Sequence, residues 1–331
     1  MSDLKVLCDG NFKNGLPLND LIRMVKFNHP DVIFLPYDNS RADVILSIDG
    51  FPNNFNSDIR KVIYMGSLNK FNENLTISHR RNDEYLQNID HVFFNSNYYK
   101  NIMCSKYKFK KCSVLYPFGG IPADDNLQPV EHREPITGTL HFVSMAKWYK
   151  RIYKRINQVV KLYDDYIIRE YPDSYLHIIG SGKETFTKSE GRVIYYKKDF
   201  HCLEYIDIMK KSHIHIIPTP FDTGPKTLNE SLHYRVPFIC SDNCAGKEYI
   251  DILGSCGISI GTDKFIKDYD SYSHYRPVER SKFYNREINY EKYFIAVKEI
   301  LNNFNKYTSW KWNDKLNYKK QSDDLYNILK G

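Results

Sequence analysis

The sequence lacks the features of a membrane-spanning or secreted protein. No apolar run approaches the roughly 20 residues that a helix needs to cross a bilayer. The first ten residues, MSDLKVLCDG, contain no basic segment followed by an apolar one, so no signal peptide is visible. The seven cysteines form no Cys-x-x-Cys pair, which favours reduced thiols over disulfides or a structural zinc site. We therefore expect a cytoplasmic protein, or one of the host cytoplasm if the source is viral.

Several catalytic signatures are absent as well. The sequence has no Walker phosphate-binding loop, no Gly-x-Ser-x-Gly nucleophile elbow and no constellation of metal ligands. Its charge is only moderately basic, because 47 Lys and Arg residues against 40 Asp and Glu residues give +7. That balance suits an anionic ligand, such as a nucleotide diphosphate, a nucleic acid or an acidic membrane surface. A lysine-rich composition that keeps the protein in solution is the alternative explanation.

Apolar segments are plentiful. With 331 residues, of which 42% are hydrophobic, the chain can fill the cores of two domains. Short β-rich apolar runs alternate with amphipathic segments of helical period, which is typical of parallel sheets whose strands are buried on both faces. The predicted strands are 5–8, 31–35, 43–47, 61–65, 91–95, 113–116, 140–143, 175–179, 193–196, 213–217, 236–240 and 257–260. The predicted helices are 18–28, 81–89, 97–104, 150–170, 202–211, 226–234, 287–304 and 315–330.

A linker divides these elements into two series. Residues 117–136 contain four prolines, two glycines and several acids, a composition typical of a connection between domains. Strands and helices alternate on both sides of it. The sequence therefore predicts an α/β protein with two Rossmann-like, doubly wound parallel-sheet domains, the first at 1–122 and the second starting at 136.

The segment after the predicted strand at 213–217 carries the strongest functional signal. It reads PTPFDTGPKTLNE from Pro218 to Glu230. Ligands bind at the carboxyl ends of strands in doubly wound folds, so this loop would deliver Asp222 and Gly224 to a site. Pro225 suits the first position of a helix, whose open N–H groups and dipole attract an anion, while Glu230 can reach towards a sugar or ribose hydroxyl. An ordinary strand–helix unit with surface acids is the alternative. The open N–H groups would belong to Lys226, Thr227 and Leu228.

This segment resembles the donor site of retaining glycosyltransferases with the two-domain GT-B fold, in the family 4-like group. That group has a strand, a Pro-Ser pair, two acids separated by seven residues, and a further strand that begins with Pro-Val. Here seven residues separate Asp222 from Glu230, and residues 218–219 and 236–239 fall in register. Two positions depart from the pattern: the first acid is Asp where Glu is usual, and Arg235 stands where glycine is usual.

A second element resembles the family's strand–Gly-Arg–loop–Lys-Gly segment. It matches residues 142–151, which puts Lys150 at the place of the lysine that binds the diphosphate. Met145 replaces the family's arginine, and Lys147 or Arg151 is left to supply the second cation. Such cations stabilise the negative charge that develops on a departing diphosphate. A solvated basic helix face is the alternative for these residues.

Two weaker matches complete the second half. Gly180 and Gly182 resemble the family's Gly-x-Gly strand end, where small residues let the nucleotide approach. Residues 241–248 resemble the loop with a glutamate that follows the next strand. Together the four elements keep the family's order and spacing across residues 140–250.

The first half matches the family only in its general pattern. His79 and Asp49 are candidates for the loop histidine or acid that lies near the reacting carbon in such enzymes. The resemblance assigns acceptor binding to a domain at 1–122 and nucleotide-sugar binding to a domain at 136–305. It also implies that the helix at 306–331 crosses back to the first domain.

The reaction that this resemblance implies is the transfer of a hexosyl or pentosyl group from a nucleotide-diphosphate sugar to a hydroxyl. A UDP-sugar is the commonest donor, and the transfer would retain the anomeric configuration and require no metal and no further cofactor. Glu230 would hold the ribose hydroxyls, and Asp222 would hold a sugar hydroxyl. Lys150 and the helix start at 226–228 would stabilise the leaving diphosphate.

The acceptor and the oligomeric state remain open in the sequence. One hypothesis is a glycan or lipid-linked acceptor. A second is DNA that carries 5-hydroxymethylated cytosine, as modified by certain phage glycosyltransferases, because basic clusters would contact phosphates. A third is a non-catalytic protein that binds a nucleotide sugar or a nucleic acid. The basic clusters lie at 80–81, 106–111 and 147–155.

Overall fold

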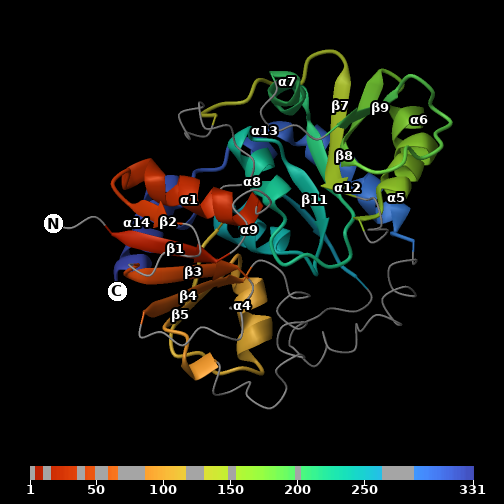
Figure 1. Cartoon of the computed structure of the whole chain (residues 1–331). Helices are drawn as coiled ribbons and strands as arrows, with labels where there is room; N and C mark the ends of the chain where they lie inside the picture. Colours follow the sequence, from red (N-terminus) through yellow and green to blue (C-terminus); the bar gives the residue numbers. More distant parts are fainter. Residues whose placement is uncertain are drawn as a thin grey trace. The chain divides into compact units, whose positions relative to one another are not determined.

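The structure of the chain forms two compact units (Figure 1). It is a computed structural model that describes residues 4–9, 16–35, 42–48, 59–65, 86–116, 130–147, 154–197, 203–262 and 287–331. Residues of Met1–Phe118 and Trp312–Gly331 make up the first unit, and residues of Gly119–Ile266 and Ser271–Lys311 make up the second. None of the described helices combines the length and the apolar character that crossing a bilayer requires.

A six-stranded sheet forms the centre of the first unit. Its strand order is β2-β1-β3-β4-β5-β6, and every neighbouring pair is parallel. The inner strands are apolar and buried at consecutive positions, as at 44–46 and 62–65, because both faces of a parallel sheet are covered. The strands are β1 (Lys5–Asp9), β2 (Ile33–Leu35), β3 (Val44–Ile48), β4 (Arg60–Met65), β5 (His91–Phe94) and β6 (Cys112–Val114).

The helix near the carboxyl end of the chain belongs to the first unit. Asp323 in this helix accepts a hydrogen bond from Asn28 Nδ2 at 3.2 Å, and Gln321 Oε1 accepts one from the backbone N–H of Tyr116 at 2.9 Å. These contacts join it to α1 and to the segment after β6. The helices of this unit are α1 (Leu16–Asn28), α4 (Asn97–Cys104) and α14 (Tyr318–Lys330).

The second unit contains another six-stranded parallel sheet, in the order β12-β11-β10-β7-β8-β9. Counted along the chain within this unit, the order is 3-2-1-4-5-6 when read from β9, which is the doubly wound arrangement of dinucleotide-binding domains. The two sheets confirm the predicted α/β fold. The strands are β7 (Leu140–Lys147), β8 (Ser174–Ser181), β9 (Val193–Lys197), β10 (Ile214–Ile217), β11 (Phe238–Ser241) and β12 (Gly257–Ile260).

Side chains alternate between the two faces of this sheet. Phe142, Ile214 and Ile216 join one core cluster with residues of α5 and α12, whereas Val143 and Met145 join another with residues of α7. Figure 1 shows α5, α6 and α12 together on one side of β7 and β8. The helices of the unit are α5 (Ile156–Leu162), α6 (Ile168–Glu170), α7 (Leu203–Lys211), α8 (Lys226–His233), α9 (Gly246–Leu253), α12 (Tyr290–Asn302) and α13 (Phe304–Thr308).

Some elements differ from the sequence prediction. The helix expected at 150–170 begins at Ile156 in the described residues and passes through a π-helical turn, Tyr163–Ile167, before α6. The sequence did not predict α9 or α13. The helix expected at 81–89 lies mostly outside the described residues.

Candidate functional site

The strand order of the second unit reverses between β7 and β10, which lie side by side although β8 and β9 come between them in the sequence. Ligands of doubly wound sheets bind beyond the carboxyl ends of the strands at such a reversal. β7 ends at Lys147, and the described chain resumes at Lys154. β10 ends at Ile217 and continues into the loop 218–225. These two segments define the candidate site.

An ion pair joins the two segments. Lys154 Nζ lies 2.6 Å from Asp222 Oδ2, and the two side chains are only 18% and 15% exposed. The backbone N–H of Gly224 donates to the other carboxylate oxygen of Asp222 at 3.2 Å. Partly buried charges need a partner, so the pair holds the predicted acid in one position. The sequence did not single out Lys154 as a site residue, although it belongs to the basic cluster at 147–155.

Arg155 makes a second contact between the same segments. Its backbone is left-handed, with φ 53°, and α5 begins directly after it. Its guanidinium donates to the carbonyl oxygen of Pro218 at 3.4 Å, and the residue is 7% exposed. A left-handed conformation is uncommon for a residue other than glycine and is found where the surrounding structure enforces it. Two consecutive residues, Lys154 and Arg155, therefore contact the chain that leaves β10.

The loop that carries Asp222 rests on the segment after β11. The backbone N–H of Asp222 donates to the carbonyl oxygen of Asn243 at 3.0 Å, and its own carbonyl accepts from Ala245 N–H at 2.9 Å. Ser241 Oγ donates to the Thr219 carbonyl at 2.8 Å. The segment 241–248, which the sequence associates with the site, thus supports the acidic loop through two backbone hydrogen bonds and the Ser241 hydroxyl.

The helix α8 begins at Lys226, as predicted, but Pro225 is not its first residue. Pro225 is the extended N-cap, with φ −67° and ψ 115°. Of the three N–H groups assigned to an anion, that of Leu228 already donates to the Pro225 carbonyl at 3.0 Å. Thr227 lies in the first turn and is buried. The positive end of the helix dipole still lies directly after the loop that holds Asp222.

Glu230 is buried in the interior of the site, with 1% of its surface exposed. Tyr205 on α7 donates its hydroxyl to Glu230 Oε2 at 2.5 Å, and the same hydroxyl lies 3.7 Å from the sulfur of Met145. The carboxylate is therefore held by a neighbouring helix. The sequence missed Tyr205, because nothing in its local pattern distinguishes it from a core aromatic residue.

The two predicted glycines lie at the carboxyl end of β8 and directly after it. Gly180 pairs with Ala146 of β7 and has φ 146°, a backbone conformation that residues other than glycine rarely adopt. Gly182 follows the strand and is exposed. The structure thus brings Gly180 to the carboxyl ends of β7 and β8, next to the strand reversal.

Several predicted site residues lie outside the described part of the chain. These are Lys150, Arg151, His79 and Asp49, and the side chain of Lys147 is also outside it. Their roles remain predictions.

Arg235 explains the departure from the usual glycine. Its φ is 51°, so the position does demand a left-handed backbone. The guanidinium donates to the carbonyl oxygens of Thr308 and Trp310, both at 2.8 Å, and Nε donates to that of Val130 at 2.6 Å. It also lies 5.3 Å from the Trp310 ring centroid. Burial lowers the pKa of Arg235. Arg235 therefore has an unfavourable backbone conformation, and its side-chain hydrogen bonds hold two segments that are distant in the sequence.

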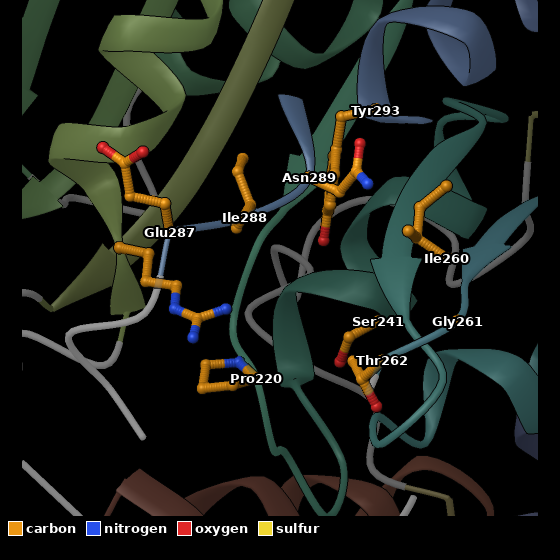
Figure 2. Close-up of a pocket in the computed structure, with 10 residues that line it drawn as sticks. Pro220, Ser241, Ile260, Gly261, Thr262, Glu287, Ile288, Asn289 and Tyr293 are labelled. Carbon is orange, nitrogen blue, oxygen red and sulfur yellow. The ribbon is translucent and has the colours of Figure 1, made fainter. Parts of the chain in front are cut away.

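A cavity of about 280 Å³ lies at the same edge of the sheet (Figure 2). Ser241 borders it from the carboxyl end of β11, and Pro220 and Thr262 border it from the segments after β10 and β12. Asn289 borders it from the start of α12, where its side chain accepts from Lys292 N–H at 2.9 Å. The sheet edge is therefore hollowed next to the acidic loop. The remaining lining residues are Arg155, Ile260, Gly261, Glu287, Ile288 and Tyr293.

Comparison with solved structures identifies the fold. No protein-family model and no curated protein sequence matches the chain. WaaG, a glycosyltransferase involved in lipopolysaccharide biosynthesis, is similar with a TM-score of 0.59 and 10% identity over 98% of this chain and 97% of WaaG. The lipopolysaccharide outer core galactosyltransferase WaaB gives 0.60 and 13% over 98% and 99%. Anabaena Alr3699/HepE in complex with UDP-glucose gives 0.55 and 10% over 98% and 95%. The chain therefore has the GT-B glycosyltransferase fold.

Proposed function

We propose that this protein is a glycosyltransferase that moves a sugar from a nucleotide-diphosphate sugar, a UDP-sugar, to a hydroxyl of a glycan or lipid-linked acceptor. The observation that carries the proposal is the acidic loop and helix at the strand reversal, where Asp222 and Glu230 lie with Lys154 and the start of α8. Similarity over nearly the whole chain to glycosyltransferases, one of them bound to UDP-glucose, supports it.

In this proposal the donor diphosphate binds between Lys154 and the amino end of α8. Lys154 supplies a cation in the segment that leads into α5, and the dipole of α8 adds partial positive charge. Both favour the charge that develops on the diphosphate as the glycosidic bond breaks. Lys150 and Lys147 or Arg151 would add to this charge. The ion pair with Asp222 keeps Lys154 in place before the donor arrives.

The two acids have different tasks in the proposed reaction. Asp222, at the tip of the loop, accepts a hydrogen bond from a hydroxyl of the transferred sugar. Glu230 accepts hydrogen bonds from the ribose hydroxyls. The hydrogen bond from Tyr205 holds the carboxylate in the orientation that this binding requires. The transfer proceeds with retention and without a metal. Residues 136–305 bind the donor in this scheme, and residues 1–122 bind the acceptor.

A nucleotide panel tests the donor site. We expect one of UDP, GDP, ADP, CDP and dTDP to raise the thermal midpoint in the presence of EDTA, with UDP the strongest. Glu230→Gln and Lys154→Gln should each weaken the binding of that nucleotide by about 30-fold, because each removes a charged hydrogen-bonding group worth about 2 kcal/mol. Lys161→Gln is the matched control, since Lys161 is an exposed lysine of α5 whose ion-pair partner, Glu287, is exposed as well.

Turnover distinguishes an enzyme from a binding protein. We expect slow release of UDP from a UDP-sugar in water and faster release with a suitable acceptor. A wild-type protein that binds none of the nucleotides would contradict the proposed donor site. Binding without any release from a series of UDP-sugars would favour the non-catalytic alternative.

DNA is the alternative acceptor, and the same preparation tests it. In the described part of the basic cluster at 106–111, Lys110 is paired with Asp90 at 2.9 Å and Lys106 lies over the Tyr107 ring. Contacts within the protein therefore already engage two lysines of that cluster. Affinity for DNA that falls steeply with salt, together with sugar transfer to hydroxymethylated DNA, would favour this alternative over a glycan acceptor.

A further inference from the structure

A second and larger cavity lies at the opposite end of the strands that carry the candidate site. Its volume is about 490 Å³, and it is bordered by the beginnings of β7 and β10, the carboxyl end of α7 and the segment 130–139. All of these belong to the second unit. The charged and imidazole groups on its wall are His132, Arg133, Glu134, His141, Lys210, Lys211 and His213.

The carbonyl groups at the carboxyl end of α7 do not depend on the two lysines of this wall for a positively charged partner. Lys210 and Lys211 form the last turn of α7, where cations commonly offset the helix dipole. Here Arg133 performs that task, since its guanidinium donates to the carbonyl oxygens of Met209 and Ser212 at this helix end. It donates to Tyr234 as well, at 2.8 Å. Both lysines are exposed, so they add positive charge to a cavity wall that is already basic.

One of the histidines on this wall adds a hydrogen-bond donor. The backbone N–H of His141 donates to Nδ1 of His213 at 3.0 Å, so the neutral His213 ring carries its proton on Nε2 and acts there as a donor. The two rings are stacked, with centroids 6.2 Å apart. Burial and then Arg133 lower the pKa of His213 to about 4, and burial and then Lys211 lower the pKa of His141. Arg133 and Lys211 thus place positive charge beside these two rings.

We propose that this cavity binds a phosphate-bearing ligand. Phosphate offers acceptor oxygens and negative charge, and the wall offers two ammonium groups, an imidazole N–H and a fixed guanidinium against the single carboxylate of Glu134. The volume admits a phosphate together with the small group to which it is attached. The site is separate from the donor site, because it lies at the amino ends of strands whose carboxyl ends carry Asp222 and Lys154. A free phosphorylated molecule and a phospholipid headgroup share this chemistry.

Histidine NMR of the full chain tests the proposal, with inorganic phosphate and pyrophosphate as the probes. We expect saturable shifts of the His141 and His213 ring signals. Replacing both lysines, as Lys210→Gln with Lys211→Gln, should weaken the apparent affinity by about tenfold, because each exposed charge contributes modestly. Lys319→Gln with Lys320→Gln, another pair of adjacent exposed lysines on a helix, should leave it unchanged.

The controls separate this site from the donor site and from a general charge effect. Lys154→Gln should leave the histidine shifts in place. Absence of saturable shifts, or equal weakening in the two double-lysine variants, would overturn the proposal. Vesicles of phosphatidylcholine with phosphatidylglycerol identify the source of the phosphate. Vesicle binding that phosphate competes away and that the Lys210→Gln, Lys211→Gln variant loses indicates a lipid headgroup, whereas phosphate binding without vesicle binding indicates a free molecule.

Discussion

Replacing Arg235 separates the cost of its left-handed backbone from the contribution of its side chain. Arg235→Ala removes the guanidinium but keeps Cβ, and Arg235→Gly removes both. The guanidinium donates to three backbone carbonyls, and the residue is 7% exposed. Hydrogen bonds from a charged donor contribute about 1.5–3 kcal/mol each and are not additive when one group shares them, so we expect Arg235→Ala to destabilise the second unit by about 3–5 kcal/mol.

The glycine variant should lose less. A left-handed conformation costs a residue with Cβ at least about 1 kcal/mol more than it costs glycine. We therefore expect Arg235→Gly to be more stable than Arg235→Ala by about 1 kcal/mol, although it has the smaller side chain.

Urea unfolding followed by tryptophan fluorescence measures both differences, because Trp310 lies under the guanidinium. Lys247→Ala, at an exposed position of α9, serves as the control and should change the free energy of unfolding by less than about 0.5 kcal/mol. Stability of Arg235→Ala equal to wild type would refute the role of the side chain. A glycine variant no more stable than the alanine variant would refute the conformational argument.

Three further predictions concern other parts of the chain. Tyr205→Phe should weaken nucleotide binding by roughly 3- to 10-fold in calorimetry, because Glu230 loses the hydroxyl that orients it, and unchanged or tighter binding would argue against that role. Burial lowers the pKa of His177 to about 3, so below the unfolded value of about 6.5 the unfolded chain takes up a proton that the folded chain does not. Stability should then fall by up to about 1.4 kcal/mol per pH unit from pH 6.5 downwards, and His177→Gln should flatten this slope in denaturant titrations. Gly257→Ala should destabilise by about 1–3 kcal/mol, because its Cβ would lie 2.3 Å from a carbonyl oxygen of β11, whereas Gly261→Ala has open space and should melt like wild type.

The strands could be predicted because their sequence pattern follows directly from their environment. A parallel strand covered on both faces is apolar at consecutive positions, as β3 and β4 are, and no distant partner is needed to recognise it. α9 was missed for the opposite reason. It begins at Gly246, and glycine disfavours helices. The structure requires a glycine there because a Cβ at this position would lie 2.7 Å from Cys240 Sγ on β11. Only the packed structure reveals that requirement.

In the candidate site, too, some features follow from the local sequence and others depend on the packed structure. The spacing of Asp222 and Glu230 is local, and the hypothesis of a site at this loop and helix follows from it. Their partners are not local, since Lys154 precedes Asp222 by 68 residues and Tyr205 precedes Glu230 by 25. Which of several lysines or aromatic residues makes each contact depends on the strand order, which brings β7 beside β10.

The position of α14 in the first unit affects the order of folding during synthesis. Arg60 in β4 donates to the carbonyl oxygen of Ile328 at 3.0 Å, and Ser322 Oγ donates to that of Val25 at 3.3 Å. These bonds cannot form until α14 has been translated. The first unit therefore cannot be completed before α14 has been translated, whereas the described strands of the second unit all precede α14 in the chain. Of the two units, the one whose strands are translated first is completed last.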